Sequence, residues 1–85
     1  MAIDLVYFAW VRERIGRDGE RIDPPAEVRD IADLVDWLAA RDGGYAEAFA
    51  DRSRLRYAAD QAFCPPETPI AGVREIAIFP PVTGG

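Results

Sequence analysis

Residues 30–41 read DIADLVDWLAAR, and this stretch predicts the central helix of the chain. Four apolar side chains follow the i, i+3, i+4, i+7 spacing of one buried stripe, namely Ile31, Leu34, Val35 and Leu38. Asp30 is a suitable N-cap, and Asp33 lies in the first turn, where an acidic side chain is favoured. Gly43 and Gly44 end the segment. The chain therefore has one amphipathic helix that needs an apolar layer to pack against.

Extended segments lie on both sides of this helix. β-Branched and aromatic residues without chain breakers are typical of strands, and they occupy residues 3–10 (IDLVYFAW), 20–23, 55–59, 62–63 and 74–79. Short helical segments are expected at two further places, residues 11–15 before Gly16 and residues 45–50.

This order of elements predicts an α+β fold. Two strands, a helix and then two or more strands favour a mixed four- to five-stranded sheet with one main helix packed on one face. A β-grasp roll, known from ubiquitin-like proteins, satisfies the order because its first and last strands lie side by side. We expect a folded domain over residues 1–79 and an extended, flexible C-terminal tail over residues 80–85 that ends in Gly-Gly.

Composition excludes several classes of function. The 85 residues allow one small domain, and the net charge of −5 disfavours binding to nucleic acid. The chain has no His and only one Cys, Cys64, so neither a metal centre nor a catalytic pair is expected. No signal sequence or membrane-spanning run is recognisable, which favours a cytoplasmic protein that binds no membrane. We therefore expect a protein that binds no cofactor and is not an enzyme by itself.

Three phenylalanines are candidates for an exposed partner-binding patch. Asp4 indicates that the even-numbered positions of residues 3–10 face outward, so Phe8 points away from the core. Pairing of the first and last strands places Phe79 on the same outer face. Phe63 joins them if strand alternation continues across the turn before it. A cluster of exposed aromatic side chains more often marks a partner site than scattered surface residues.

The C-terminus is built to present a carboxylate. Pro80 and Pro81 favour an extended exit from the last strand, and the β-branched Val82 and Thr83 also prefer extended backbone. Gly84 and Gly85 carry no Cβ, so the tip fits through a narrow channel. An α-carboxylate can attack the α-phosphate of ATP, and a sulfur nucleophile can then displace AMP from the acyl-adenylate to leave a thiocarboxylate.

Two motifs resemble a known family, the small sulfur-carrier subunit of molybdopterin synthase (MoaD). They are FPPVTGG, residues 79–85, and YFAWVRE, residues 7–13. The resemblance implies a ubiquitin-like β-grasp fold and a Gly85 that is adenylated, with ATP, by an activating enzyme and then converted to a thiocarboxylate using sulfur from a sulfurtransferase. It also implies docking on the large catalytic subunit, in a heterotetramer of two small and two large subunits, and transfer of sulfur to cyclic pyranopterin monophosphate.

Some features differ from the family, and other functions remain open. The family has a Gly-Asp-Glu turn before the last strand, where this chain has GVRE at residues 72–75, and Asp60 replaces a frequent Asn in another turn. Alternative functions are a sulfur carrier for thiamine synthesis, a ubiquitin-like modifier that forms isopeptide bonds through Gly85, and an interaction module with an incidental tail. Cys64 has no basic neighbour, which favours a small apolar residue over a reactive thiol.

Overall fold

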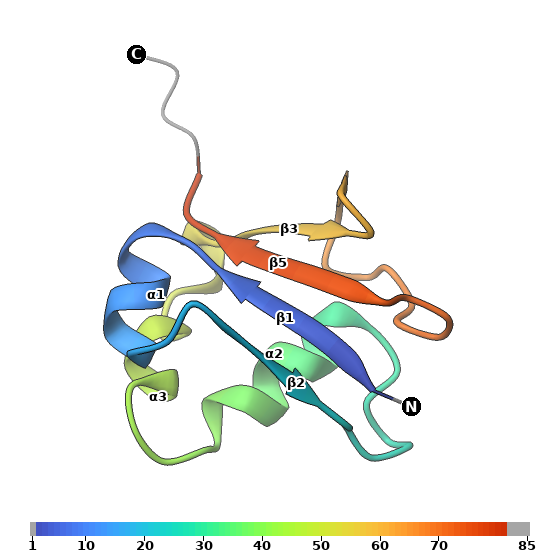
Figure 1. The fold of residues 1–85 in the computed structure, drawn as a ribbon, viewed down its shortest axis with the longest axis horizontal. Coiled ribbons are helices and arrows are strands. Elements are labelled where there is room, and N and C mark those ends of the chain that lie inside the picture. Colours follow the sequence, from blue (N-terminus) through green and yellow to red (C-terminus); the bar gives the residue numbers. More distant parts are fainter. Residues whose placement is uncertain (1, 82–85) are drawn as a thin grey trace.

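The computed structural model describes residues 2–81, and within them one mixed five-stranded sheet forms the body of the protein. The strands are β1 (Ile3–Tyr7), β2 (Gly19–Ile22), β3 (Arg56–Ala59), β4 (Ala62–Cys64) and β5 (Glu75–Phe79). Their order across the sheet is β2-β1-β5-β3-β4 (Figure 1). The first and last strands run parallel in the middle of the sheet, and every other pair is antiparallel.

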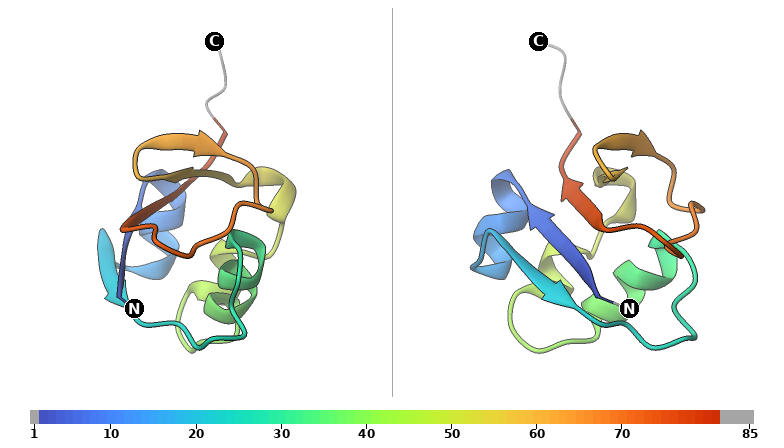
Figure 2. Two further views of the ribbon diagram at one scale, coloured as in Figure 1. Left: turned by 90° about the vertical axis from the view of Figure 1, so that its right-hand side faces the viewer. Right: turned by 45° about the vertical axis from the view of Figure 1, so that its right-hand side comes forward.

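The helices are α1 (Ala9–Ile15), α2 (Ile31–Ala39) and α3 (Tyr45–Ala48), with a 3₁₀ turn η1 (Arg52–Arg54). Helix α2 lies against one face of the sheet, and the turned views show this face covered while the other stays open (Figure 2). A sheet of this order wrapped around one helix is the β-grasp fold. The predicted α+β architecture with one main helix is confirmed.

Helix α2 forms as its sequence predicts. The Asp30 carboxylate accepts a hydrogen bond from the Asp33 backbone N–H at 2.8 Å, and the Asp33 carboxylate accepts one from the Arg29 N–H at 3.1 Å. These bonds satisfy N–H groups that have no partner within a helix. The four residues of the apolar stripe have no exposed surface. They pack against the inward side chains of the two central strands, Ile3, Leu5, Tyr7, Ile76 and Ile78.

The expected strand over residues 3–10 is too long. Strand β1 ends at Tyr7, and Phe8 keeps extended backbone as the N-cap of α1. Ala9 has a positive φ of 53°, which turns the chain out of the sheet and into the helix. Helix α1 therefore starts two residues earlier than the sequence suggests and places Trp10 on a helix. Gly16 ends it with a φ of 89°, and its N–H bonds to the Arg12 carbonyl at 2.8 Å.

Other strand boundaries also differ from expectation, since β2 begins at Gly19 and ends at Ile22 and β4 extends to Cys64. Leu55 is buried, but its N–H bonds to the Arg52 carbonyl at 3.1 Å, so it closes η1 and β3 begins at Arg56. Strand β5 begins at Glu75, one residue later than expected, and the Asp60 side chain accepts hydrogen bonds from the N–H groups of both Arg74 and Glu75 at this junction. Of the helices in residues 2–81, none has the length and apolarity needed to span a bilayer.

Candidate functional site

Phe8, Phe63 and Phe79 form one cluster on the open face of the sheet, which we call the aromatic patch. The Phe8 and Phe79 ring centroids lie 6.5 Å apart in an edge-to-face arrangement, and those of Phe63 and Phe79 lie 5.7 Å apart. Phe63 is 83% exposed and Phe8 is 47% exposed, although burial of either ring would be favourable. The structure thus brings together the three phenylalanines that the sequence predicts to form an exposed patch. Their binding of a partner remains a prediction.

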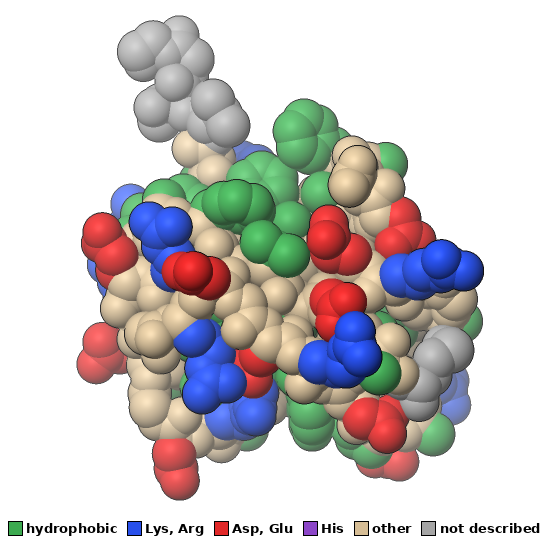
Figure 3. All heavy atoms as spheres, viewed as in Figure 1, with side chains coloured by type: hydrophobic (Ala, Val, Ile, Leu, Met, Phe, Trp, Pro, Cys, Tyr) green, Lys and Arg blue, Asp and Glu red, His purple; other side chains and the backbone are tan. Residues whose placement is uncertain are grey.

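The aromatic patch borders a shallow hollow over the end of β5. The hollow has a volume of about 490 Å³, and its lining combines the three phenylalanines with Ala77, Pro80 and Pro81. Gln61 and Glu75 supply the polar rim. Hydrophobic side chains gather on this part of the surface, while acidic and basic side chains occupy the areas around it (Figure 3). An apolar centre with a polar rim is the usual anatomy of a protein–protein interface.

Pairing of the first and last strands positions two of the rings. In the parallel register Tyr7 lies opposite Ile78. The next residues, Phe8 and Phe79, therefore lie at the same end of these two neighbouring strands. Tyr7 and Ile78 point into the core and are almost fully buried. Their neighbours along the chain consequently point to the open face, because successive strand side chains alternate.

A buried carboxylate anchors the strand that carries Phe8. The Glu20 carboxylate accepts hydrogen bonds from the hydroxyls of Tyr7 at 2.8 Å and Tyr45 at 2.6 Å, and its second oxygen lies 3.1 Å from the Arg41 guanidinium. Burial alone would raise the pKa of Glu20, but the hydrogen bonds from Tyr45 and Tyr7 and the charge of Arg41 together lower this pKa below its ordinary value. Burial and the bond to Glu20 raise the pKa of Tyr7, so its hydroxyl stays protonated and donates. We call these residues the Glu20 cluster.

Asp60 anchors the turn that carries Phe63. Its Oδ1 atom accepts hydrogen bonds from the backbone N–H groups of Arg74 and Glu75, both at 3.0 Å. Asp60 and Gln61 have positive φ angles of 48° and 72°, as a tight two-residue hairpin between β3 and β4 requires. The sequence indicated only a turn here. Its link to the start of β5 was missed, because fifteen residues separate Asp60 from Glu75.

The segment that departs from the resembled family turn is accommodated without distortion of the sheet. Gly72 adopts a left-handed φ of 80°, and nothing lies within 4 Å of the place where a Cβ would be. The Arg74 carbonyl accepts a hydrogen bond from the Asp4 N–H at 2.9 Å, which continues the pairing of β5 with β1. Arg in place of Asp in this turn therefore leaves the last strand in register.

The tail is described only at its base. Pro80 and Pro81 follow β5 and are both half-buried at the edge of the aromatic patch. Val82, Thr83, Gly84 and Gly85 lie outside the described residues, so their expected roles remain predictions. Cys64 is half-buried in β4. No group of three or more side chains able to hold a metal occurs within residues 2–81.

Comparison of the sequence with known proteins identifies the family of the chain. Residues 5–85 match the ThiS family, which is nearly the whole chain. The chain belongs to the ThiS family. Among curated relatives of this ThiS-family protein, the molybdopterin synthase sulfur carrier subunit of Escherichia coli (strain K12) is 34% identical over 83 residues, covering 98% of this chain and 99% of the relative. The subunit of the same name from Haemophilus influenzae (strain ATCC 51907 / DSM 11121 / KW20 / Rd) is 31% identical with the same coverage. The resemblance seen in the two sequence motifs is confirmed.

Solved structures of other proteins show the same fold as this chain. The crystal structure of SAMP1 from Haloferax volcanii aligns with a TM-score of 0.72 at 22% identity and covers all of both chains. A putative molybdopterin converting factor, subunit 1, from Pyrococcus furiosus aligns with a TM-score of 0.71 at 22% identity, covering 96% of this chain and 99% of that one. At these identities the likeness extends to the fold alone.

Proposed function

We propose that this protein is the sulfur-carrying small subunit of a molybdopterin synthase and that Gly85 carries the sulfur. The observation that carries the proposal is the junction at Phe79, where the last strand ends beside an exposed aromatic patch and leads through Pro80 and Pro81 toward a terminal Gly-Gly. Relatives that span the same length are named as sulfur carrier subunits, which supports this reading.

The chemistry proceeds on the α-carboxyl of Gly85. A carboxylate oxygen attacks the α-phosphorus of ATP in the activating enzyme, the bond to pyrophosphate breaks, and an acyl-adenylate forms. The persulfide of a sulfurtransferase then attacks the carbonyl carbon, and AMP leaves with the bonding electrons. A thiol reduces the resulting acyl disulfide, which releases the thiocarboxylate and a new disulfide. The resulting thiocarboxylate transfers its sulfur to cyclic pyranopterin monophosphate in the active site of the large subunit, and two such transfers build the dithiolene.

The folded body carries the aromatic patch directly before Pro80 and Pro81, and Gly85 follows Pro81 by four residues in the sequence. The aromatic patch binds the activating enzyme or the large subunit, and the proline-stiffened base directs the tip into that partner's active site. Positioning of this kind supplies much of the advantage of an enzymatic reaction, and a misplacement of about 1 Å can cost on the order of a hundredfold in rate.

Reconstitution with and without Gly85 tests the proposal. Purified large subunit, activating enzyme, sulfurtransferase, ATP and cyclic pyranopterin monophosphate are combined with the wild-type chain, and dithiolene formation is measured. Deletion of Gly85 moves the carboxylate back by about 3.5 Å and is expected to abolish product. Product formation at the wild-type rate by the deletion variant would refute the assignment of Gly85. A stable protein conjugate in place of a thiocarboxylate would indicate a ubiquitin-like modifier.

A further inference from the structure

A groove continues from the aromatic patch around the corner of the sheet. A hollow of about 290 Å³ shares Phe63 and Phe79 with the aromatic patch and adds Arg56, Tyr57 and Cys64. A second hollow, of about 440 Å³, shares these last three residues and extends to α2. The shared lining residues make the hollows one path, which we call the side groove, from Phe79 to Val35.

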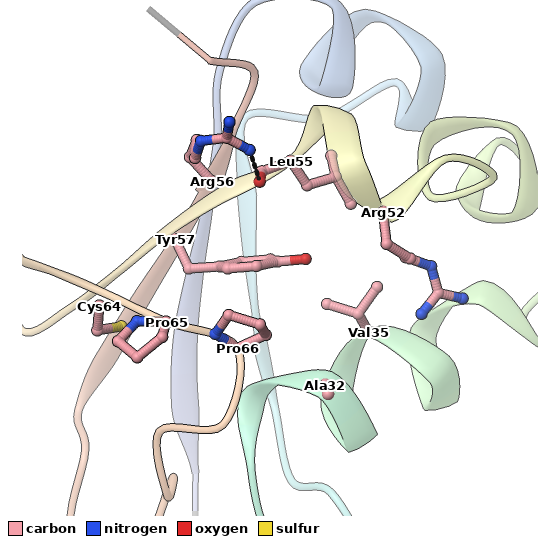
Figure 4. A pocket seen from close by; sticks show the side chains of 9 residues that line it. All are labelled: Ala32, Val35, Arg52, Leu55, Arg56, Tyr57, Cys64, Pro65 and Pro66. Atoms are coloured by element: carbon pink, nitrogen blue, oxygen red, sulfur yellow. Dashed lines mark hydrogen bonds between the residues drawn. The ribbon is translucent and has the colours of Figure 1, made fainter.

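The side groove is apolar along its floor. Ala32 and Val35 of α2 form one wall, and Leu55 faces them from the other side, with Pro65 and Pro66 at the end nearest the edge strand (Figure 4). The Tyr57 ring reaches across this space, with its hydroxyl toward the side where Val35 and Arg52 lie (Figure 4). Val35, Leu55 and Tyr57 are themselves buried. The apolar side chains that a bound segment could contact are the partly or fully exposed ones above them, Ala32, Cys64, Pro65 and Pro66.

The polar groups around the side groove are mainly hydrogen-bond donors. The Arg56 guanidinium donates to the carbonyls of Ser53 at 3.0 Å and Leu55 at 2.8 Å, and within residues 2–81 it pairs with no carboxylate. The Tyr57 hydroxyl has no protein hydrogen-bond partner among those residues. Burial raises the pKa of Tyr57, although the nearby Arg52 and Arg56 oppose the shift, so the hydroxyl remains a donor.

Arg52 differs from Arg56 because its charge is already compensated. It forms an ion pair with Asp36 of α2, and its Nε donates to the Phe49 carbonyl at 2.6 Å. Arg56 is therefore the cation of the side groove that remains available to an outside acceptor. A guanidinium suits a carboxylate, since both are planar and can form two parallel hydrogen bonds.

We propose that the side groove binds an extended segment of the large subunit, in which apolar side chains lie against Ala32, Pro65 and Pro66 and a carboxylate pairs with Arg56. This inference rests on the proposed function, because the aromatic patch is taken as the main contact with that subunit. Continuity between the two surfaces and the unpaired cation at their junction favour a single partner that covers both. The Arg56 guanidinium also defines the chemistry that the partner must offer, an acidic residue beside an apolar stretch.

Charge reversal at Arg56 is the principal test. The affinity of purified large subunit for the wild-type chain and for Arg56→Glu is measured by titration calorimetry at low and high salt. We expect Arg56→Glu to weaken binding about tenfold or more and to reduce its salt dependence, because an attractive charge pair becomes repulsive. Arg74→Glu is the matched control, since Arg74 is exposed and lies at the opposite end of β5. Its affinity should stay within about twofold of wild type.

A second variant keeps the test valid if Arg56 also supports the local fold. Ala32→Glu places a carboxylate at the far end of the side groove, near the N-terminus of α2, where an acidic side chain favours the helix. It is expected to fold normally and to weaken binding about fivefold or more, whereas Ala26→Glu, at an exposed loop position, should not.

The outcomes separate this inference from the proposed function. If Phe79→Ala weakens binding while Arg56→Glu and Ala32→Glu both retain wild-type affinity, the side groove is not part of the interface and the proposed function stands. If the wild-type chain fails to bind the large subunit at all, the proposed function is refuted and the side groove with it.

Discussion

Phe79 connects the last strand with the proposed docking surface. It ends β5, contacts both other rings of the aromatic patch and directly precedes Pro80. We expect Phe79→Ala to weaken binding to the activating enzyme and to the large subunit by about tenfold or more, because burial of an aromatic side chain contributes about 1–3 kcal/mol. Calorimetric titration with each partner measures this. Wild-type affinity for both would remove Phe79 from the docking surface.

Asp60 stabilises the start of β5 through one atom, Oδ1, and this role can be tested by substitution. Asp60→Ala removes the acceptor of two backbone N–H groups and places alanine at a φ of 48°. Both effects are unfavourable, so we expect a loss of about 1–3 kcal/mol in the free energy of unfolding. Asp60→Asn keeps the Oδ1 acceptor and tolerates a positive φ, so its loss should be about 0.5 kcal/mol or less. Urea unfolding of the two variants distinguishes them, and equal stability would contradict the assigned role.

At the scale of elements, Gly44 sets how closely α3 approaches α1. A Cβ at this position would lie 1.5 Å from the Arg14 carbonyl oxygen, so only glycine fits without movement of a helix. We expect Gly44→Ala to destabilise the protein by about 1–3 kcal/mol, the usual cost of overpacking. Thermal unfolding gives the size of the effect. The amide resonances of Arg14 and Ile15 should also shift. Gly43→Ala also loses stability, because alanine is strained at a φ of 94°, but its Cβ meets open space, so these two resonances should stay near their wild-type positions.

The Glu20 cluster joins β1, β2 and α3, and it makes stability depend on pH in a defined direction. The pKa of Glu20 is lowered in the folded protein, so its contribution to stability is present above the unfolded pKa of about 4.3 and is lost as the pH falls through the lower folded value. Glu20→Gln should therefore be less stable than wild type at pH 7, and the difference should shrink below about pH 4. Unfolding measured across this range tests the sign. A difference that grows on acidification would contradict it.

The sequence predicts the elements better than their junctions. The stripe in α2 and the alternation in β1 and β5 are local patterns, and they suffice for the layers of the fold and for the outward direction of Phe8 and Phe79. The boundary at Ala9 was missed because IDLVYFAW contains no breaker, and a positive φ at alanine leaves no trace in a residue pattern. The 3₁₀ turn η1 was also missed, because its Asp51 cap looks like an ordinary loop residue in the sequence.

Contacts between residues that lie far apart in the sequence could not be predicted from local patterns either. Glu20 stood only as the first residue of a short predicted strand, and its bonds to Tyr7 and Tyr45 span 13 and 25 residues. The side groove likewise forms only when β3, β4 and α2 come together. Residues that act through such contacts carry no local signal and required the folded structure.

At the scale of the whole molecule, the proposed function gives the folded body and the terminal diglycine separate roles. Among residues 2–81 the last buried core residue is Ile78, and Phe79, the two prolines and the terminal diglycine follow it in the sequence. The body should therefore fold without the tip. Removal of Gly85 is expected to leave the melting temperature and the circular dichroism spectrum unchanged while it abolishes sulfur transfer, so that loss of function cannot be attributed to unfolding.

The most direct test of the account is the intact mass of the chain after incubation with the activating enzyme, ATP and a sulfurtransferase with its sulfur source. The account predicts a mass increase equal to the exchange of one oxygen for one sulfur, located by fragmentation at the Gly85 carboxyl and absent when ATP is omitted. The variant that lacks Gly85 should show no such increase. An unchanged wild-type mass, or sulfur found on Cys64 instead of the C-terminus, would contradict the claim that Gly85 is the carrier.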